Sequence, residues 1–413
     1  MPTGILSSAY RVAATASAPL VAVGLACSAR GRRRYAERFG AWERVPPVEW
    51  WLHGASVGEV QGLLPFVAAV RAELPRSKIL LTSTSPTGLD RGGESFDHRR
   101  LLPIDVGLCV RRALSHVSAQ RFVLAETELW PTFLTELLAR NIPLHIVNGR
   151  VSDYTFQWYR KFRLVLAPIL ARARTISVAY DAERERYLEL GARPEAIHVT
   201  GHSKYDVEPR FVSGAARASF FPDEPLDTPI VVLGSMRPGE DEGWLQAIKH
   251  SLLETKRLKV ILAPRHMEKV EYFARRLSES GVSWRLWSAS SSDPSDVVVL
   301  DTMGRLEEAY ACASLAFIGG TLVDVGGHNP LEPAMYGVPV VIGPYTAVIR
   351  EVVQEMRQRN GIIDATSAND LKVILGRLVA ADAALRDVGE RGQEVWLQHR
   401  GAAKRILSVI HHG

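Results

Sequence analysis

Short apolar runs recur along the chain, and each is followed by glycine, hydroxyl or charged residues and then by a segment with helical spacing of apolar residues. Runs of this kind are typical of strands buried on both faces of a parallel sheet. A first set lies at 48–53, 78–81, 121–125, 144–147, 176–179 and 198–200, and a second set lies at 230–233, 259–263, 297–300, 315–318 and 338–342. The pattern predicts two doubly wound α/β units, with ligands bound at the carboxyl ends of the strands.

Between the two sets, residues 208–228 contain Pro209, Gly214, Pro222 and Pro225 and show no clear periodicity. Such a segment is typical of a connection between domains. We therefore expect an N-terminal segment (1–34), a first domain (35–207), a linker (208–228), a second domain (229–385) and a C-terminal helix (386–413) that packs back on the first domain.

The N-terminal segment has no charged residue from position 12 to position 29, and Arg30, Arg32, Arg33 and Arg34 follow it. Its length is near the minimum for a membrane span, and arginines on its carboxyl side would keep the following domain in the cytoplasm. We expect a membrane anchor or an interfacial helix. A helix packed in a soluble core and a cleaved signal peptide are the other interpretations.

The composition, with 46% hydrophobic and 23% charged residues among 413, is that of a globular protein of two or three domains. The net charge of +5 is partly local to the N-terminal arginines, and no basic face with interleaved aromatic residues recurs later, which argues against nucleic acid. Three scattered cysteines indicate neither a disulfide framework nor a zinc site, so a reducing compartment is expected.

Candidate chemistry in the first unit follows the strands. Glu59 lies in the first turn of a helix after a strand, where it could act as a general base or simply complement the helix dipole. Glu126 and Glu128 follow another strand; if strand geometry continues through them they point to opposite faces, so at most one faces a cleft. Lys204, after a later strand, could neutralise a developing anion or be a solvated surface charge.

In the second unit, the stretch 317–344 is predicted to form a strand, a glycine-rich loop, a short helix and a strand. Asn329 can cap the helix, Pro330 suits its first turn, and Glu332 follows in capping-box spacing. A helix start facing a glycine loop favours a nucleotide, with Glu332 accepting from a ribose hydroxyl. Neither a Gly-x-Gly-x-x-Gly fingerprint nor a Walker lysine loop is present, which weakens dinucleotide and P-loop interpretations.

Eight motifs in order resemble one known family, the 3-deoxy-D-manno-octulosonic acid (Kdo) transferases of lipopolysaccharide synthesis. They are ASVGE at 55–59, TSPTG at 84–88, ETELWP at 126–131, NGR at 148–150, TGHSK at 200–204, PRH at 264–266, DTMG at 301–304 and GGHNPLE at 326–332. Each string alone is weak, whereas the ordered series covers nearly the whole chain and is highly specific.

The resemblance implies a GT-B glycosyltransferase, with two Rossmann-like domains facing a central cleft, that moves Kdo from CMP-Kdo to the lipid A precursor at the cytoplasmic face of the inner membrane. It implies an inverting reaction without metal or other cofactor. Glu59 matches the family's catalytic base, and Glu126 and Lys204 match positions that stabilise the transition state. The implied CMP-Kdo contacts are Pro264, Arg265, Met303, Gly304, Arg305, Asn329, Pro330, Leu331 and Glu332.

The chain departs from the family pattern at a few positions. Arg305 stands where the family usually has Glu, which puts the ribose or base contact there in doubt, and His202 replaces a more usual Asn or Ser. Two other functions fit the same architecture. A nucleotide-sugar epimerase would need acid and base groups around the sugar and no membrane segment, and a non-catalytic nucleotide-sugar-binding protein would not need the Glu59 carboxylate.

Overall fold

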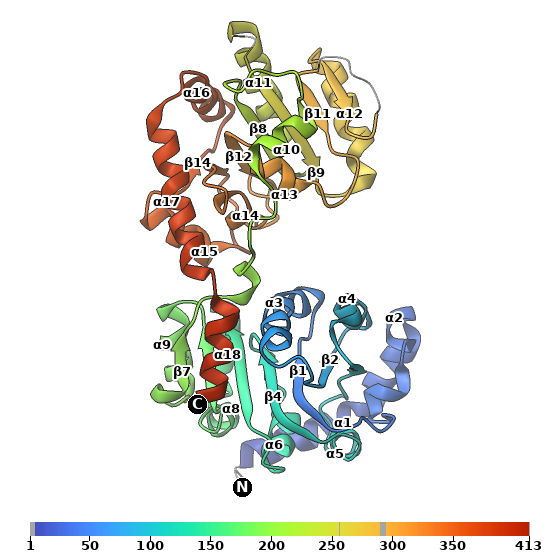
Figure 1. The fold of residues 1–413 in the computed structure, drawn as a ribbon. Coiled ribbons are helices and arrows are strands. Elements are labelled where there is room, and N and C mark those ends of the chain that lie inside the picture. The colour runs from blue at the N-terminus through green and yellow to red at the C-terminus, as the bar shows by residue number, and fades with distance from the viewer. Residues whose placement is uncertain (1–4, 256, 290–294, 413) are drawn as a thin grey trace. The chain divides into compact units, whose positions relative to one another are not determined.

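The computed structural model describes residues 5–255, 257–289 and 295–412, and it divides into two compact units. Unit 1 is the chain up to Val207 together with the segment from His399, and unit 2 is Glu208–Gln398. Each unit is built on one seven-stranded sheet (Figure 1). The predicted fold class, two doubly wound α/β units, is confirmed.

The sheet of unit 1 has the order β3-β2-β1-β4-β5-β6-β7, and all its pairings are parallel. From β1 the next strands in sequence, β2 and β3, are added on one side, and β4 to β7 are added on the other. Doubly wound sheets bind ligands at such a switch point, or reversal, at the carboxyl ends of the two strands that flank it, here β1 and β4. The strands are β1 Val48–His53, β2 Ile79–Ser83, β3 His98–Leu101, β4 Ala119–Ala125, β5 Leu144–Gly149, β6 Thr175–Val178 and β7 Ile197–Val199.

Helices cover both faces of this sheet. Trp50 and Trp51, consecutive residues of β1, point to opposite faces because side chains alternate along a strand. Trp50 packs against Phe66 at 5.6 Å between ring centroids, and Trp51 packs against Phe122 at 5.1 Å. The helices of unit 1 are α1 Ile5–Cys27, α2 Ala29–Arg32, α3 Val57–Glu73, α4 Pro86–Gly92, α5 Gly107–Leu114, α6 Pro131–Leu138, α7 Asp153–Lys161, α8 Arg163–Leu170, α9 Asp181–Leu190 and α18 Ala402–His412.

Unit 2 repeats the plan with the order β10-β11-β9-β8-β12-β13-β14, and its reversal falls between β8 and β12. Its strands are β8 Ile230–Met236, β9 Lys259–Pro264, β10 Trp284–Leu286, β11 Val297–Val299, β12 Leu315–Ile318, β13 Val340–Ile342 and β14 Ile363–Asp364. Its helices are α10 Ser213–Phe220, α11 Asp241–Thr255, α12 Val270–Ser280, α13 Leu306–Ala311, α14 Leu331–Ala334, α15 Arg350–Gln358, α16 Ala368–Val379 and α17 Ala383–His399.

The three strands that the hydrophobic pattern did not predict, β3, β10 and β14, all lie at sheet edges. An edge strand is covered on one side only and needs no continuous apolar run. The sequence of β3, His98-Arg99-Arg100-Leu101, illustrates this, since only Leu101 is fully buried.

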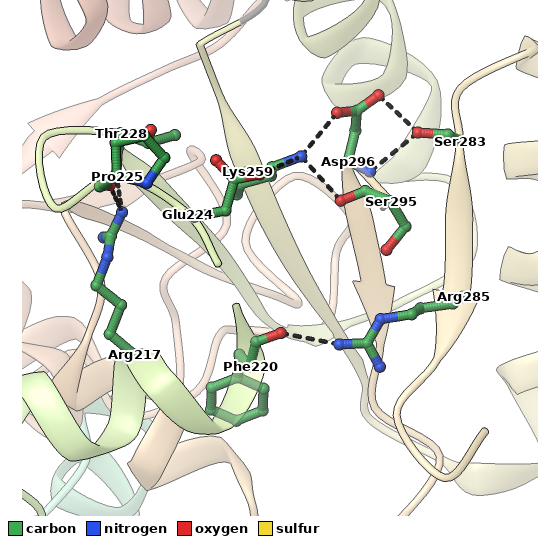
Figure 2. A network of polar contacts seen from close by, with 10 residues as sticks. All are labelled: Arg217, Phe220, Glu224, Pro225, Thr228, Lys259, Ser283, Arg285, Ser295 and Asp296. Atoms are coloured by element: carbon green, nitrogen blue, oxygen red, sulfur yellow. Dashed lines mark hydrogen bonds and ion pairs between the residues drawn. The ribbon is translucent and has the colours of Figure 1, made fainter. Parts of the chain in front are cut away.

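Residues 208–228, expected to be a linker, contain helix α10 and belong to unit 2. Two arginines order this segment, as Figure 2 shows: within it, Arg217 donates to the Thr228 carbonyl at 2.9 Å, and Arg285 of β10 ties it to the sheet by donating to the Phe220 carbonyl at 2.8 Å. Lys259 adds ion pairs to Glu224 at 2.9 Å and to Asp296 at 3.1 Å. Because α10 has eight residues and polar contacts hold its segment in place, the sequence there shows little apolar periodicity.

The predicted C-terminal helix is interrupted at Gly401, where φ is +77°. Helix α17 ends before it, and α18 follows it and packs through Ile406 and Leu407 on the core of unit 1. The Asp206 carboxylate accepts the backbone N–H groups of Gly401 at 2.6 Å and Ala403 at 2.9 Å. Asp206 therefore caps α18 beside the point where the chain leaves unit 1 for unit 2.

At the other end of the chain, α1 contains a segment, Ser8–Cys27, that is long and apolar enough to cross a membrane and is not buried within the protein. Length and composition alone identify it. The helix is nevertheless held to unit 1, because Tyr10 donates to the Asp105 carboxylate at 2.8 Å and Tyr35 donates to the Ala22 carbonyl at 3.0 Å.

Candidate active site

Glu59 follows β1 and lies in the first turn of α3, where its carboxylate has two local donors. Ala55 N–H donates to one oxygen at 2.6 Å, and the Ser56 hydroxyl donates to the other at 3.1 Å. Ser56 in turn accepts the Glu59 N–H at 3.2 Å and so caps the helix. Burial raises the pKa of Glu59, and these hydrogen bonds oppose that rise. The side chain therefore both stabilises the helix start and lines a cavity.

Glu126 and Glu128 come directly after β4, and both line the same cavity as Glu59. The expectation that at most one of them would face a cleft is wrong. Its premise fails at Glu126, whose φ of +53° is left-handed, so the two-residue alternation of the strand stops at Ala125. Left-handed backbone is costly for a side chain larger than glycine, and the Glu126 N–H bond to the Val147 carbonyl at 2.8 Å helps to hold it.

The cavity has a volume of about 520 Å³. It lies at the carboxyl ends of β1, β4 and β5, beside the β1/β4 reversal where a doubly wound sheet binds ligands. Its lining residues, all in unit 1, are Glu59, Glu126, Thr127, Glu128, Leu129, Trp130, Arg150, Ser152, Thr155 and Tyr159. Three carboxylates, one guanidinium and two aromatic side chains thus share one small space.

The electrostatics of the cavity raise the pKa of two of its carboxyl groups to about 7. Burial and the nearby Glu59 charge raise the pKa of Glu126 to about 7, while Arg150 and Lys204 oppose the shift. The pKa of Glu128 is also raised to about 7, by burial and then by the charge of Glu59. Neighbouring carboxyl groups cannot all ionise together, and active sites commonly use the resulting difference in pKa to give one group an acid role and another a base role.

Lys204 lies in the turn after β7, and a buried network sets its backbone. The Asn148 side chain accepts the Ser203 N–H at 2.9 Å and donates to the Ser203 hydroxyl at 2.9 Å. His202 accepts the Lys204 N–H at 3.1 Å. The turn packs against Gly62 of α3, where an added Cβ would lie 3.9 Å from Cβ of Lys204. Lys204 itself is exposed, and its charge acts on Glu126.

The structure thus brings Glu59 and Glu126 together, with Lys204 close enough to influence Glu126. Sequence reasoning did not assign Arg150, Trp130 or Tyr159, although the first two lie inside motifs that it quoted. The signal for Arg150 was its place after β5, one residue beyond the strand. Tyr159, on α7, lies in an aromatic and basic stretch that suits either a phosphorylated amphiphile or aromatic packing under a helix, and its position in the cavity depends on the fold.

The candidate donor residues of unit 2 follow β9, β11 and β12. Pro264 ends β9 and is buried, whereas Arg265 is exposed and donates its N–H to the Met236 carbonyl at 3.0 Å. Met303 is 76% exposed, and Gly304 has a φ of +88° with open space beside it. The backbone of the loop after β11 is therefore accessible, as contacts with a flat base or a ribose require.

Arg305, by contrast, is already held within unit 2. Its guanidinium donates to the Ser219 hydroxyl at 2.9 Å, pairs with Glu308 at 2.9 Å and lies 4.6 Å from the centre of the Trp287 ring. Ser219 belongs to α10, so the residue that departs from the family pattern joins α10 to α13.

The segment Asn329–Glu332 differs in detail from the predicted cap. Helix α14 is only four residues long, and Pro330, not Asn329, occupies its N-cap position without a side-chain cap bond. Asn329 still stabilises the turn, since its side-chain oxygen accepts the Leu331 N–H at 3.0 Å and its amide lies 3.5 Å from the Glu332 carboxylate. Glu332 is exposed; burial raises the pKa of Tyr310, and the charge of Glu332 adds to that rise.

Comparison with known proteins gives a consistent result over most of the chain. A family model described as 3-deoxy-D-manno-octulosonic-acid transferase (kdotransferase) matches residues 33–207. A 3-deoxy-D-manno-octulosonic acid transferase of Haemophilus influenzae is 31% identical over 393 residues, which cover 93% of this chain and 92% of the relative. One of Bordetella pertussis is 28% identical over 411 residues, covering 92% and 94%.

Among solved structures, a UDP-GlcNAc 2-epimerase from Neisseria meningitidis bound to UDP-GlcNAc is similar, with a TM-score of 0.62. The match covers 88% of this chain and 100% of that one at 11% sequence identity. At this identity the likeness concerns the fold alone, and it confirms the GT-B type of fold expected from the motifs.

Proposed function

This chain belongs to the Kdo transferase family and is a glycosyltransferase, and from that premise we propose that it transfers Kdo from CMP-Kdo to the lipid A precursor lipid IVA, with inversion at the anomeric carbon. The observation that carries the proposal is the cavity of unit 1, in which Glu59, Glu126 and Glu128 meet.

In this mechanism Glu59 is the general base. It accepts the proton of an acceptor hydroxyl, the hydroxyl oxygen attacks the anomeric carbon of Kdo, and the bond from that carbon to the phosphate oxygen breaks with its electrons leaving on CMP. The two donors on the Glu59 carboxylate orient it, and a base held in place typically contributes 10²- to 10⁴-fold. Glu126 and Lys204 stabilise the charge that develops in the transition state as the bond to CMP breaks.

The donor is assigned to unit 2. Arg265 would pair with the phosphate, the exposed backbone of Met303 and Gly304 would read the base, and the segment from Asn329 through Pro330 and Leu331 to Glu332 would hold the ribose. The open loop after β11 and the exposed carboxylate of Glu332 support these roles. Since Arg305 is engaged with Ser219 and Trp287, we assign it to the support of this loop instead of to the ligand.

An amphiphilic acceptor at the cytoplasmic face of the inner membrane is supported by two surfaces of unit 1. The apolar segment Ser8–Cys27 is unburied. Helix α7 lines the cavity with Thr155 and Tyr159, and it exposes Tyr154 and Trp158, with Lys161 lying 4.7 Å from the Trp158 ring centre. Aromatic and basic side chains side by side suit the interfacial region of a bilayer.

The test is to incubate the purified full chain with CMP-Kdo and tetra-acylated lipid A precursor, with EDTA and in parallel with Mg²⁺, and to resolve the products by mass. We expect one or more Kdo units to be added at equal rates in both arms. CMP release without a lipid product would refute the acceptor, and a requirement for Mg²⁺ would refute metal independence. Intact CMP-Kdo after incubation with folded protein would refute the donor and leave the epimerase or binding functions.

A further inference from the structure

A compact hydrogen-bond cluster in unit 2 lies between the two segments assigned above to the donor. The Tyr336 hydroxyl donates to the Glu307 carboxylate at 3.1 Å. Glu307 is in the first turn of α13, directly after the loop that contains Met303 and Gly304. Tyr336 comes two residues after α14, which contains Glu332. One hydrogen bond therefore joins the two donor segments.

The same two side chains also hold the beginning of unit 2. The Tyr336 hydroxyl accepts the backbone N–H of Arg210 at 3.2 Å and that of Phe211 at 3.4 Å. The Glu307 carboxylate accepts the Arg210 side chain, at 2.7 Å from Nε and with a second contact from the other end of the guanidinium. Arg210 is the third residue after the chain has left unit 1.

Burial indicates which member of the cluster matters most. The Glu307 side chain is 14% exposed, whereas that of Arg210 is 67% exposed. A shielded carboxylate that accepts from one tyrosine and one arginine forms strong, charge-assisted hydrogen bonds. An ion pair made by an exposed arginine alone contributes little to stability. Glu307 is thus the centre of the cluster and also accepts the backbone N–H of Arg210 at 3.3 Å, and Tyr336, just after α14, accepts the N–H groups of both Arg210 and Phe211.

We propose that Glu307 and Tyr336 are positioning residues for the donor: they hold the loop before α13 and the segment around α14 at a fixed spacing, and they tie both to residues 210–211, where the chain enters unit 2. Neither side chain touches CMP-Kdo in this role. Ligand binding between the two segments stabilises the cluster, and the N–H groups of Arg210 and Phe211 become better protected from solvent. The inference rests on the proposed donor site.

The expected kinetic signature is a split between KM and kcat. Tyr336→Phe removes one hydroxyl that makes three hydrogen bonds, and Glu307→Gln removes the charge at the centre. Each should raise KM for CMP-Kdo about tenfold, the effect of one charge-assisted hydrogen bond, and change kcat less than about twofold. Because both act on one cluster, the double variant should raise KM little further than either single variant.

The experiment combines these kinetics with hydrogen exchange of the amides of residues 210 and 211, using CMP as the probe. Wild-type protein should show slower exchange there when CMP binds, and Tyr336→Phe should abolish that difference. Tyr272→Phe is the matched control, since it also removes a hydroxyl that donates to a carboxylate, that of Asp241 at 3.0 Å. The control should leave both KM and the CMP-dependent protection unchanged, and thermal melting should show that all variants fold.

Two results would overturn the inference alone: CMP binding to wild-type protein without protection of residues 210–211, or an unchanged KM in folded Tyr336→Phe protein. A loss of kcat with KM unchanged would also contradict it, since a positioning role for the donor acts on binding. Absence of CMP binding by folded wild-type protein would instead refute the donor site, and both proposals with it.

Discussion

The two units place a glutamate at corresponding points of their sheets and use it differently. Glu59 follows β1, and Glu240 follows β8. Each of these strands comes first in sequence within its sheet, and each glutamate lies at the start of the helix that follows. Among the residues that the structure describes, the Glu59 carboxylate accepts hydrogen bonds from Ala55 and Ser56 of its own turn, and it lines a cavity. Glu240 is 1% exposed and accepts the N–H groups of Gly320, Thr321 and Leu322 after β12.

The consequence lies at the reversal of each sheet. In unit 1 the crevice between β1 and β4 stays open, and three carboxylates with raised pKa values surround it. In unit 2 the Glu240 carboxylate bridges β8 and β12 and holds the glycine loop that precedes Asn329. The comparison teaches that one topology can keep an acidic group available for chemistry in one unit and use its counterpart to shape a backbone surface in the other.

The largest expected effect comes from Glu59→Gln. The amide cannot accept the proton of the acceptor hydroxyl, so kcat should fall about 10³-fold. CMP affinity, measured by calorimetry, should stay within about twofold, since the donor is assigned to unit 2. A variant that retains a tenth or more of wild-type kcat would show that Glu59 is not the base and that the two glutamates differ less than their surroundings suggest.

Glu240→Gln should act on stability instead. An amide presents a donor to backbone N–H groups that need an acceptor, and leaving such groups unpaired in a buried site should cost about 3 kcal/mol of the free energy of unfolding. The urea transition of unit 2 should shift to lower concentration. An unchanged transition would contradict the bridging role, and the matched change at Glu59, which is partly exposed, should shift unfolding far less.

Glu126 predicts how stability depends on pH. Its pKa in the folded chain is about 7, above the ordinary value of 4.5 expected when unfolded. Between these values the folded chain holds a proton that the unfolded chain has lost, so the free energy of unfolding decreases as pH rises from 4.5 to 7 and stays lower above. Glu126→Gln should remove this dependence and stabilise the protein by about 3 kcal/mol at pH 8, relative to pH 4.5. Thermal melting at both pH values measures it, and a variant that gains nothing at pH 8 would contradict the raised pKa.

The smallest effect is expected for Arg305→Gln. The substitution loses the ion pair with Glu308 and the contact with the Trp287 ring, at a cost of about 1 kcal/mol in stability. KM for CMP-Kdo should change less than about threefold, whereas Asn329→Ala should raise it more. A large rise of KM in Arg305→Gln, with stability unchanged, would instead assign Arg305 to the ligand.

Much of the fold could be predicted from local pattern. Buried parallel strands such as 48–53 and 315–318 are continuous apolar runs, and both have the predicted bounds. Edge strands such as β3 could not be predicted in this way, because their burial depends on a single neighbouring strand. Likewise, the Glu126–Glu128 pair was visible in the sequence, but the left-handed turn at Glu126 depends on contacts with β5.

By itself, the sequence determined the α/β class, the positions of the polar residues that follow the carboxyl ends of the strands, and, through the ordered motifs, the family. These features are local: they depend on hydrophobic spacing, turn residues and short strings. The tertiary structure decided which acidic groups share a cavity, that Arg305 is held by Ser219 and Trp287, and that Glu307 meets Tyr336. Such contacts join residues far apart in the chain, and burial and charge at these points depend on neighbours that no local pattern specifies.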